Sequence, residues 1–132
     1  MNTIFVNGCF DILHRGHIEL FKYARSLGNY LIVAIDSDER VKKMKGSDRP
    51  FNNQNDRKFM LESLKYINDV EIFDSDEELC LLTKQLKPTI MIVGSDWKGK
   101  QIIGSEYAKE VRFFDRIGDY STTKILQSST DR

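Results

Sequence analysis

The stretch "TIFVNGCFDILHRGHIELFKYARSLGNYLIVAIDSD", residues 3–38, decides the expected fold because it encodes two strands with a helix between them. Residues 3–8 form a short apolar run that ends at a glycine, and residues 17–28 carry apolar side chains near the 3.6-residue period of a helix. Residues 30–38 open with an unbroken apolar run, which is typical of a strand buried on both faces of a parallel sheet. This succession predicts a parallel α/β sheet.

The same alternation of strands and helices continues along the chain. Further strands are expected at residues 69–74, 89–96 and 110–116, and further helices at 53–67, 76–87 and from 121 onward. In the helix at 53–67, the side chains expected to face the core are those of Phe59, Met60, Leu64 and Ile67. Residues 42–53 are basic and loop-like. We therefore predict a single domain over residues 1–132, a Rossmann-like, doubly wound sheet of about five parallel strands with helices on both faces.

Composition limits the kinds of partner. The 132 residues include 20 basic and 20 acidic side chains, so no overall charge favours nucleic acid or an anionic membrane, and any anion site must be local. No apolar run approaches the roughly 20 residues that span a bilayer, and the N-terminus does not resemble a signal peptide. Cys9 and Cys80 lack the spacing of a metal or redox site. We expect a reduced, cytoplasmic protein with no nucleic-acid or membrane partner.

The only two histidines, His14 and His17, stand where the first strand gives way to a helix. A zinc site would need further Cys or His ligands, and a plain surface or capping pair is also possible. A phosphate site suits the context better, because a glycine-bearing turn and a helix N-terminus offer free N–H groups and a positive dipole end. Gly16 between the histidines would let a large ligand approach the backbone. Neither a dinucleotide fingerprint nor a P-loop is present.

Two segments carry a resemblance that covers essentially the whole chain. "GCFDILHRGH" (8–17) resembles the H-x-G-H signature of the cytidylyltransferase-like nucleotidyltransferases, and "YSTTKI" (120–125) resembles their second signature. The segments at 6–17, 36–57 and 102–107 resemble the adenylyltransferase part of ADP-heptose synthase. "GSDWKGK" (94–100) and Arg116 instead resemble glycerol-3-phosphate cytidylyltransferase. The choice between ATP and CTP therefore stays open, with the heptose branch favoured.

The resemblance implies an NTP-dependent transferase that joins the nucleotide to a sugar or polyol phosphate and releases pyrophosphate, by direct in-line attack and with Mg²⁺. It implies as catalytic groups His14, His17, Lys45, Arg116, Ser121 and Thr122. It implies as nucleotide-binding positions Gly8, Cys9, Phe10, Asp11, Gly16, Gly94, Asp96, Trp97 and Thr123. It implies as acceptor-binding residues Asp38, Arg57 and Lys65.

Two of these assignments have plainer alternatives. Asp11 could hold Mg²⁺, as the resemblance implies, or could simply cap the first helix. Lys45 could clamp a phosphate or be a solvated lysine in a charged run. Relatives of this size suggest a homodimer. A nucleotide-binding module without chemistry is the non-enzymatic alternative.

Overall fold

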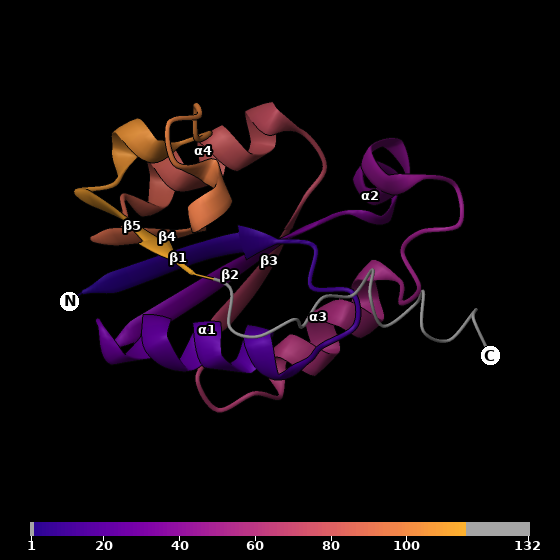
Figure 1. Ribbon diagram of the computed structural model, residues 1–132, viewed down its shortest axis with the longest axis horizontal. Helices are drawn as coiled ribbons and strands as arrows, with labels where there is room; N and C mark the ends of the chain where they lie inside the picture. Colours follow the sequence, from indigo (N-terminus) through magenta and orange to yellow (C-terminus); the bar gives the residue numbers. More distant parts are fainter. Residues whose placement is uncertain (1, 116–132) are drawn as a thin grey trace.

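A five-stranded parallel sheet forms the centre of the computed structural model, which describes residues 2–115 (Figure 1). Its strands are β1 (Thr3–Gly8), β2 (Tyr30–Asp36), β3 (Asp69–Phe73), β4 (Ile90–Gly94) and β5 (Glu110–Phe114). They lie in the order β3-β2-β1-β4-β5, and every neighbouring pair is parallel. The predicted parallel Rossmann-like sheet is thus confirmed.

Helices cover both faces of this sheet. Helices α1 (Arg15–Ser26) and α3 (Gln54–Glu62) pack on one face, and α4 (Asp76–Leu86) packs on the other with the short 3₁₀ turn Ser105–Tyr107. Helix α2 (Asp38–Lys45) stands beyond the carboxyl end of β2, clear of both layers (Figure 1). A second 3₁₀ turn, Ser95–Trp97, follows β4 directly.

The sheet separates two apolar cores, which explains the unbroken apolar runs. In β1, Ile4 faces the core beneath α1 while Phe5 faces the core beneath α4. In β2, Val33 faces the core beneath α1 and Ala34 faces the core beneath α4. Successive side chains of a strand point to opposite faces, so a strand covered on both faces needs apolar residues at every position.

Two expectations about the helices were wrong. Helix α2 occupies Asp38–Lys45, where the sequence had suggested a loop from residue 42. Val41 is the only buried residue of this helix, so the segment lacks the apolar periodicity by which a helix is predicted. The residue that could have indicated the helix start is Ser37, whose side chain accepts a hydrogen bond from the Arg40 amide. Helix α3 ends at Glu62, and Phe59 is 70% exposed, whereas Leu61 is buried.

Cys9 and Cys80 are both free thiols, as expected. Within residues 2–115, no helix is both long enough and apolar enough to cross a membrane.

The arrangement of the sheet also locates its ligand-binding edge. β1 lies between β2 and β4, so the order of strands along the sheet reverses at β1. In open α/β sheets, ligands bind beyond the carboxyl ends of the strands at such a reversal. The residues that follow β1 and β4 are therefore the first place to look for chemistry.

Candidate functional site

A strained turn follows β1. Phe10 has a φ of 50°, a left-handed conformation that costs a non-glycine residue roughly 1–2 kcal/mol. Its ring packs edge-on against Phe21 and His17, with centroid separations of 5.0 and 5.1 Å. A Cβ on Gly8 would lie 3.0 Å from that ring, so glycine lets the ring lie against the strand. Packing of Phe10 thus compensates the strain and orients the segment that leads to the histidines.

His14 and His17 form a stacked pair at the start of α1. His14 is the N-cap residue and His17 lies in the first turn, and their ring centroids are 3.7 Å apart with an interplanar angle of 22°. Burial, together with the smaller effects of the neighbouring His14 and Lys45, lowers the pKa of His17 to about 3. His17 is therefore neutral at pH 7 and can serve as a hydrogen-bond donor. Its Nδ1 has no hydrogen-bond partner among residues 2–115.

The N-terminus of α1 is open to an anion. No side chain caps it, and no acidic residue stands in its first turn. Gly16 lies between the two histidines, where its backbone is part of this first turn. Unpaired N–H groups and the positive end of a helix dipole favour phosphate at such a position. The structure thus brings the histidines and the helix end together, as the sequence predicted.

Asp11 is buried and holds the loop at residues 46–53. Its carboxylate accepts hydrogen bonds from the amides of Phe51 (2.7 Å) and Asn52 (2.8 Å), and its carbonyl accepts one from the Asn52 side chain (3.0 Å). It does not cap α1, where His14 is the N-cap residue.

The surroundings of the Asp11 carboxylate bear on its expected role toward Mg²⁺. Both of its carboxylate oxygens already accept amide hydrogens, and the Arg49 Nε lies 3.7 Å from Oδ2. No group of three or more His, Cys, Asp or Glu side chains within residues 2–115 could hold a metal ion. Asp11 thus anchors the loop in this arrangement, and its expected role toward Mg²⁺ stays a prediction.

Arg57 is completely buried and joins four parts of this edge. Its guanidinium donates to the carbonyls of Cys9 (3.0 Å), Asp36 (2.8 Å) and Asn52 (3.0 Å), and to the Asp38 carboxylate (2.9 Å). It therefore ties the ends of β1 and β2 to the loop and to the first turn of α2. A side chain with no exposed surface cannot touch an acceptor in this arrangement. The acceptor-binding role expected for Arg57 is replaced by a positioning role.

Helix α2 is fixed at its first turn and presents Lys45 at its last. Arg40 forms ion pairs with Asp36 (2.7 Å) and Asp76 (2.6 Å) and lies over the Phe73 ring. Lys45 is exposed, and its charge lowers the pKa of His17, which places it beside the histidine pair. Arg40 and Asn52 belong to this framework, although no sequence motif indicated either residue.

The other positions predicted to bind the nucleotide follow either β1 or β4. Burial raises the pKa of the Cys9 thiol, and the Cys9 carbonyl is used by Arg57. Beyond β4, Asp96 and Trp97 are exposed, with Trp97 at 46%. A Cβ on Gly94 would lie 2.6 Å from the Asp96 carboxylate, so this carboxylate folds back over the strand end. Asp96 and Trp97 thus stand at the end of the strand next to β1.

One expected residue lies elsewhere, and four lie outside the described chain. Lys65 belongs to the connection that enters the amino end of β3, opposite to the edge that carries the histidines, so the structure does not support its acceptor role. The residues that fall outside the described part of the chain are Arg116, Ser121, Thr122 and Thr123.

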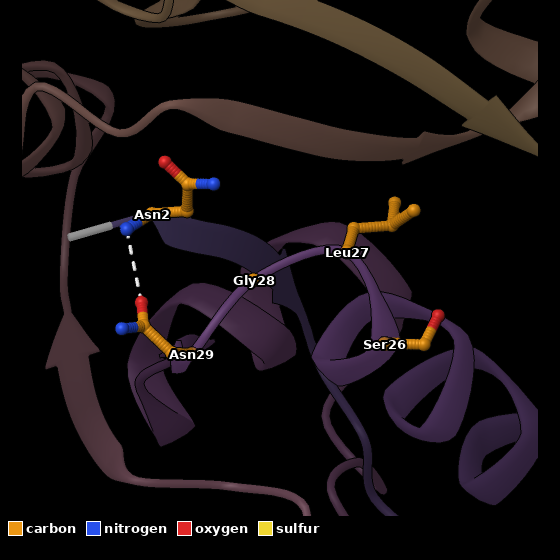
Figure 2. A pocket seen from close by; sticks show the side chains of 5 residues that line it. All are labelled: Asn2, Ser26, Leu27, Gly28 and Asn29. Atoms are coloured by element: carbon orange, nitrogen blue, oxygen red, sulfur yellow. Dashed lines mark hydrogen bonds between the residues drawn. The ribbon is translucent and has the colours of Figure 1, made fainter.

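A surface hollow occurs at the opposite, amino end of the sheet (Figure 2). It is lined by Asn2, Ser26, Leu27, Gly28 and Asn29. The Asn2 amide donates to the Asn29 side chain at 2.9 Å, and the Asn29 amide donates to the Asn2 carbonyl at 3.1 Å. The residues that line the hollow include no charged side chain, so they do not indicate a catalytic or ion-binding site.

Comparisons with known proteins agree with this geometry. The model of a family described as cytidylyltransferase-like matches residues 5–128. The chain is 46% identical over 98% of its length to the bifunctional protein HldE of Campylobacter concisus and 48% identical over 94% to that of Nitratiruptor sp.. It spans only 27% of the length of each. The crystal structure of the lipopolysaccharide core biosynthesis protein of Thermoplasma volcanium superposes with a TM-score of 0.71 at 25% identity, covering 92% of this chain and 99% of that one.

Proposed function

Because this chain belongs to the cytidylyltransferase-like family, we propose that it is a nucleotidyltransferase that joins an NTP to a sugar phosphate and releases pyrophosphate. ATP and heptose 1-phosphate are the favoured substrates. The stacked His14–His17 pair at the open N-terminus of α1, where the strand order reverses, is the observation that carries this proposal. It puts two imidazoles and a helix end at the place where phosphates bind in such sheets.

The reaction needs positioning more than proton transfer. An oxygen of the acceptor phosphate attacks the α-phosphorus of the NTP in line with the bond to the β-phosphate, which breaks and releases pyrophosphate. The attacking oxygen is already anionic at neutral pH, so no general base is required. The burial that lowers the pKa of His17 keeps its imidazole neutral, so that it donates a hydrogen bond to the charge that builds on the phosphate oxygens. Lys45 adds a cation beside it.

Asp11, Arg57 and Arg40 act by holding this edge in place. Arg57 joins the ends of β1 and β2, Asp11 pins the loop that follows Lys45, and Arg40 anchors the first turn of α2. Fixed geometry of this kind lowers the entropy that the two substrates lose on the way to the transition state. Ser121, Thr122 and Thr123 are proposed, from the family resemblance, to bind the β- and γ-phosphates.

The heptose branch rests on the identity with the HldE proteins and on the segments that resemble ADP-heptose synthase. A second candidate is glycerol-3-phosphate cytidylyltransferase. The exposed Trp97 beyond β4 favours it, because the "GSDW" segment resembles that branch and an exposed indole offers a surface on which a base can stack.

Pyrophosphate release from a matrix of substrates tests the proposal. Each NTP is incubated with heptose 1-phosphate, glycerol 3-phosphate or no acceptor, in the presence of Mg²⁺. Release is expected with ATP and heptose 1-phosphate, and release with CTP and glycerol 3-phosphate would favour the second candidate. Release from no pair would contradict the enzymatic proposal and leave a nucleotide-binding module.

Substitution of His14 tests the role of the histidine pair. For His14→Ala we expect kcat to fall by about 10²–10³ while the Kd for the NTP changes little, because a transition-state donor is lost. Lys22→Ala, an exposed change on the same helix, is the matched control and should retain full activity. Equal losses in kcat and in NTP affinity for His14→Ala would reduce His14 to a binding residue.

Mg²⁺ and a homodimer remain predictions of the family resemblance. Loss of pyrophosphate release in EDTA, restored by excess Mg²⁺, tests the first. Light scattering of the purified chain tests the second, with twice the chain mass of 15.4 kDa expected.

A further inference from the structure

Arg49, in the loop between α2 and α3, is a largely buried cation, and two of its donor atoms have no partner within residues 2–115. Its side chain is 12% exposed. Its Nε and Nη2 atoms are shielded from solvent and have no hydrogen-bond acceptor among residues 2–115. Removing a guanidinium from water without supplying acceptors costs several kcal/mol, and native proteins seldom leave such a group unsatisfied. The arrangement therefore calls for an acceptor that a ligand would bring.

Asp11 does not satisfy this guanidinium. Its Oδ2 lies 3.7 Å from the Arg49 Nε, beyond hydrogen-bond distance, and both carboxylate oxygens accept amides of the loop. The opposite charges still attract across this distance. Asp11 thus holds Arg49 at the end of β1 and leaves the donors of its guanidinium available.

Arg57 shows what a structural arginine looks like in the same region. It is also buried, but its Nε, Nη1 and Nη2 atoms all donate to protein oxygens at 2.8–3.0 Å. Asn52 connects their surroundings, because its amide donates to Asp11, the ion-pair partner of Arg49, and its carbonyl accepts from Arg57. One guanidinium has its acceptors within the fold, and the other has none in the described part of the chain.

The loop that carries Arg49 begins directly after Lys45, which stands beside the histidine pair, and its far end is pinned to Asp11. Arg49 therefore belongs to a loop that begins close to His17 and is fixed to the turn after β1 through Asp11. A guanidinium matches phosphate oxygens with two parallel N–H bonds, which an ammonium cannot do.

We propose that Arg49 is a phosphate-binding residue of this site. Naming the phosphate rests on the proposed function: it belongs either to the nucleotide or to the acceptor. Two phosphate oxygens would accept from the guanidinium and supply the acceptors that residues 2–115 do not provide.

Calorimetric titration with two probes, inorganic pyrophosphate for the nucleotide and glycerol 3-phosphate for the acceptor, tests the assignment without turnover. The variants are Arg49→Gln and Arg49→Lys, with Lys43→Gln as a control that removes one exposed positive charge from the neighbouring helix. We expect at least one probe to bind Arg49→Gln about tenfold more weakly, which is the loss of a charge-assisted hydrogen bond. Lys43→Gln should stay within about twofold of the original chain.

The probe that weakens identifies the source of the phosphate. If Arg49→Gln does not fold, Arg49→Lys decides, because it keeps the charge opposite Asp11 but loses the planar fork and should weaken binding about threefold or more. Unchanged binding of both probes, or no binding by the original chain, would overturn the assignment. Absence of pyrophosphate release from every substrate pair would instead contradict only the proposed enzymatic function.

Discussion

The carboxyl and amino ends of the sheet differ in buried charge, backbone strain and the kind of hydrogen bonds that they contain. At the carboxyl end, charged side chains are buried, Phe10 takes a left-handed conformation and two imidazoles stack. At the amino end, the chain closes with neutral amide hydrogen bonds between Asn2 and Asn29, around a glycine (Figure 2). Strain and buried charge lower stability, so a fold keeps them where a function needs them. The hollow at the amino end shows that shape alone does not make a site.

The largest expected difference between the two ends comes from the arginines. Arg57→Met should lower the free energy of unfolding by about 3–5 kcal/mol, because it leaves the Asp38 carboxylate and three backbone carbonyls without their donor. At the amino end, Arg25→Met removes one hydrogen bond to the Gly28 carbonyl and should cost about 1 kcal/mol. Urea denaturation measures both changes. Equal losses at the two ends would contradict the comparison.

A second difference concerns the carboxylate that holds the loop. Asp11→Asn should lower the free energy of unfolding by about 2 kcal/mol, because one of two charge-assisted bonds to the loop amides is lost. Pyrophosphate release should fall as well, since the loop carries Arg49 and follows Lys45. Asn29→Ala removes a neutral acceptor at the amino end and should leave release unchanged. Full pyrophosphate release by Asp11→Asn would contradict a role of this loop in the active site.

The parallel sheet could be predicted from the sequence, but only part of the candidate site could. The unbroken apolar run of β2 and the segment from Gly8 to His17 were informative, because burial on both faces and helix initiation are local properties. The burial of Arg57 could not be predicted, since its acceptors come from β1, β2 and the loop, which meet only in the folded chain. The prediction that Phe59 faces the core was wrong because the apolar pattern behind it was read as far as Ile67, whereas the helix ends at Glu62.

Gly28 offers a change in stability without a change in chemistry. A Cβ at this position would lie 2.4 Å from the Asn2 carbonyl oxygen and 2.8 Å from Ile4. Gly28→Ala should therefore lower the free energy of unfolding by about 1–3 kcal/mol through overpacking. At a temperature where the variant is folded, kcat/KM should stay within about threefold. A larger loss would give the amino end a role in catalysis.

The effect with the smallest change per step is a dependence of stability on pH that comes from His17 and accumulates gradually over several pH units. Burial lowers the pKa of His17 to about 3 from 6.5, so between these values the unfolded chain binds a proton that the folded chain does not. Stability should fall as the pH falls through this window, by up to about 1.4 kcal/mol per pH unit. His17→Gln should have a shallower slope below pH 6.5. Identical slopes in urea denaturation would show that His17 is not held neutral by the fold.

The most direct test of the functional assignment is the rate of pyrophosphate release by His17→Gln and Gly28→Ala under one set of conditions, with ATP and heptose 1-phosphate. If the stacked histidines at the carboxyl end perform the chemistry, kcat should fall by about 10²–10³ in His17→Gln and stay near that of the original chain in Gly28→Ala. Full kcat in a folded His17→Gln variant would contradict the assignment of the histidine pair.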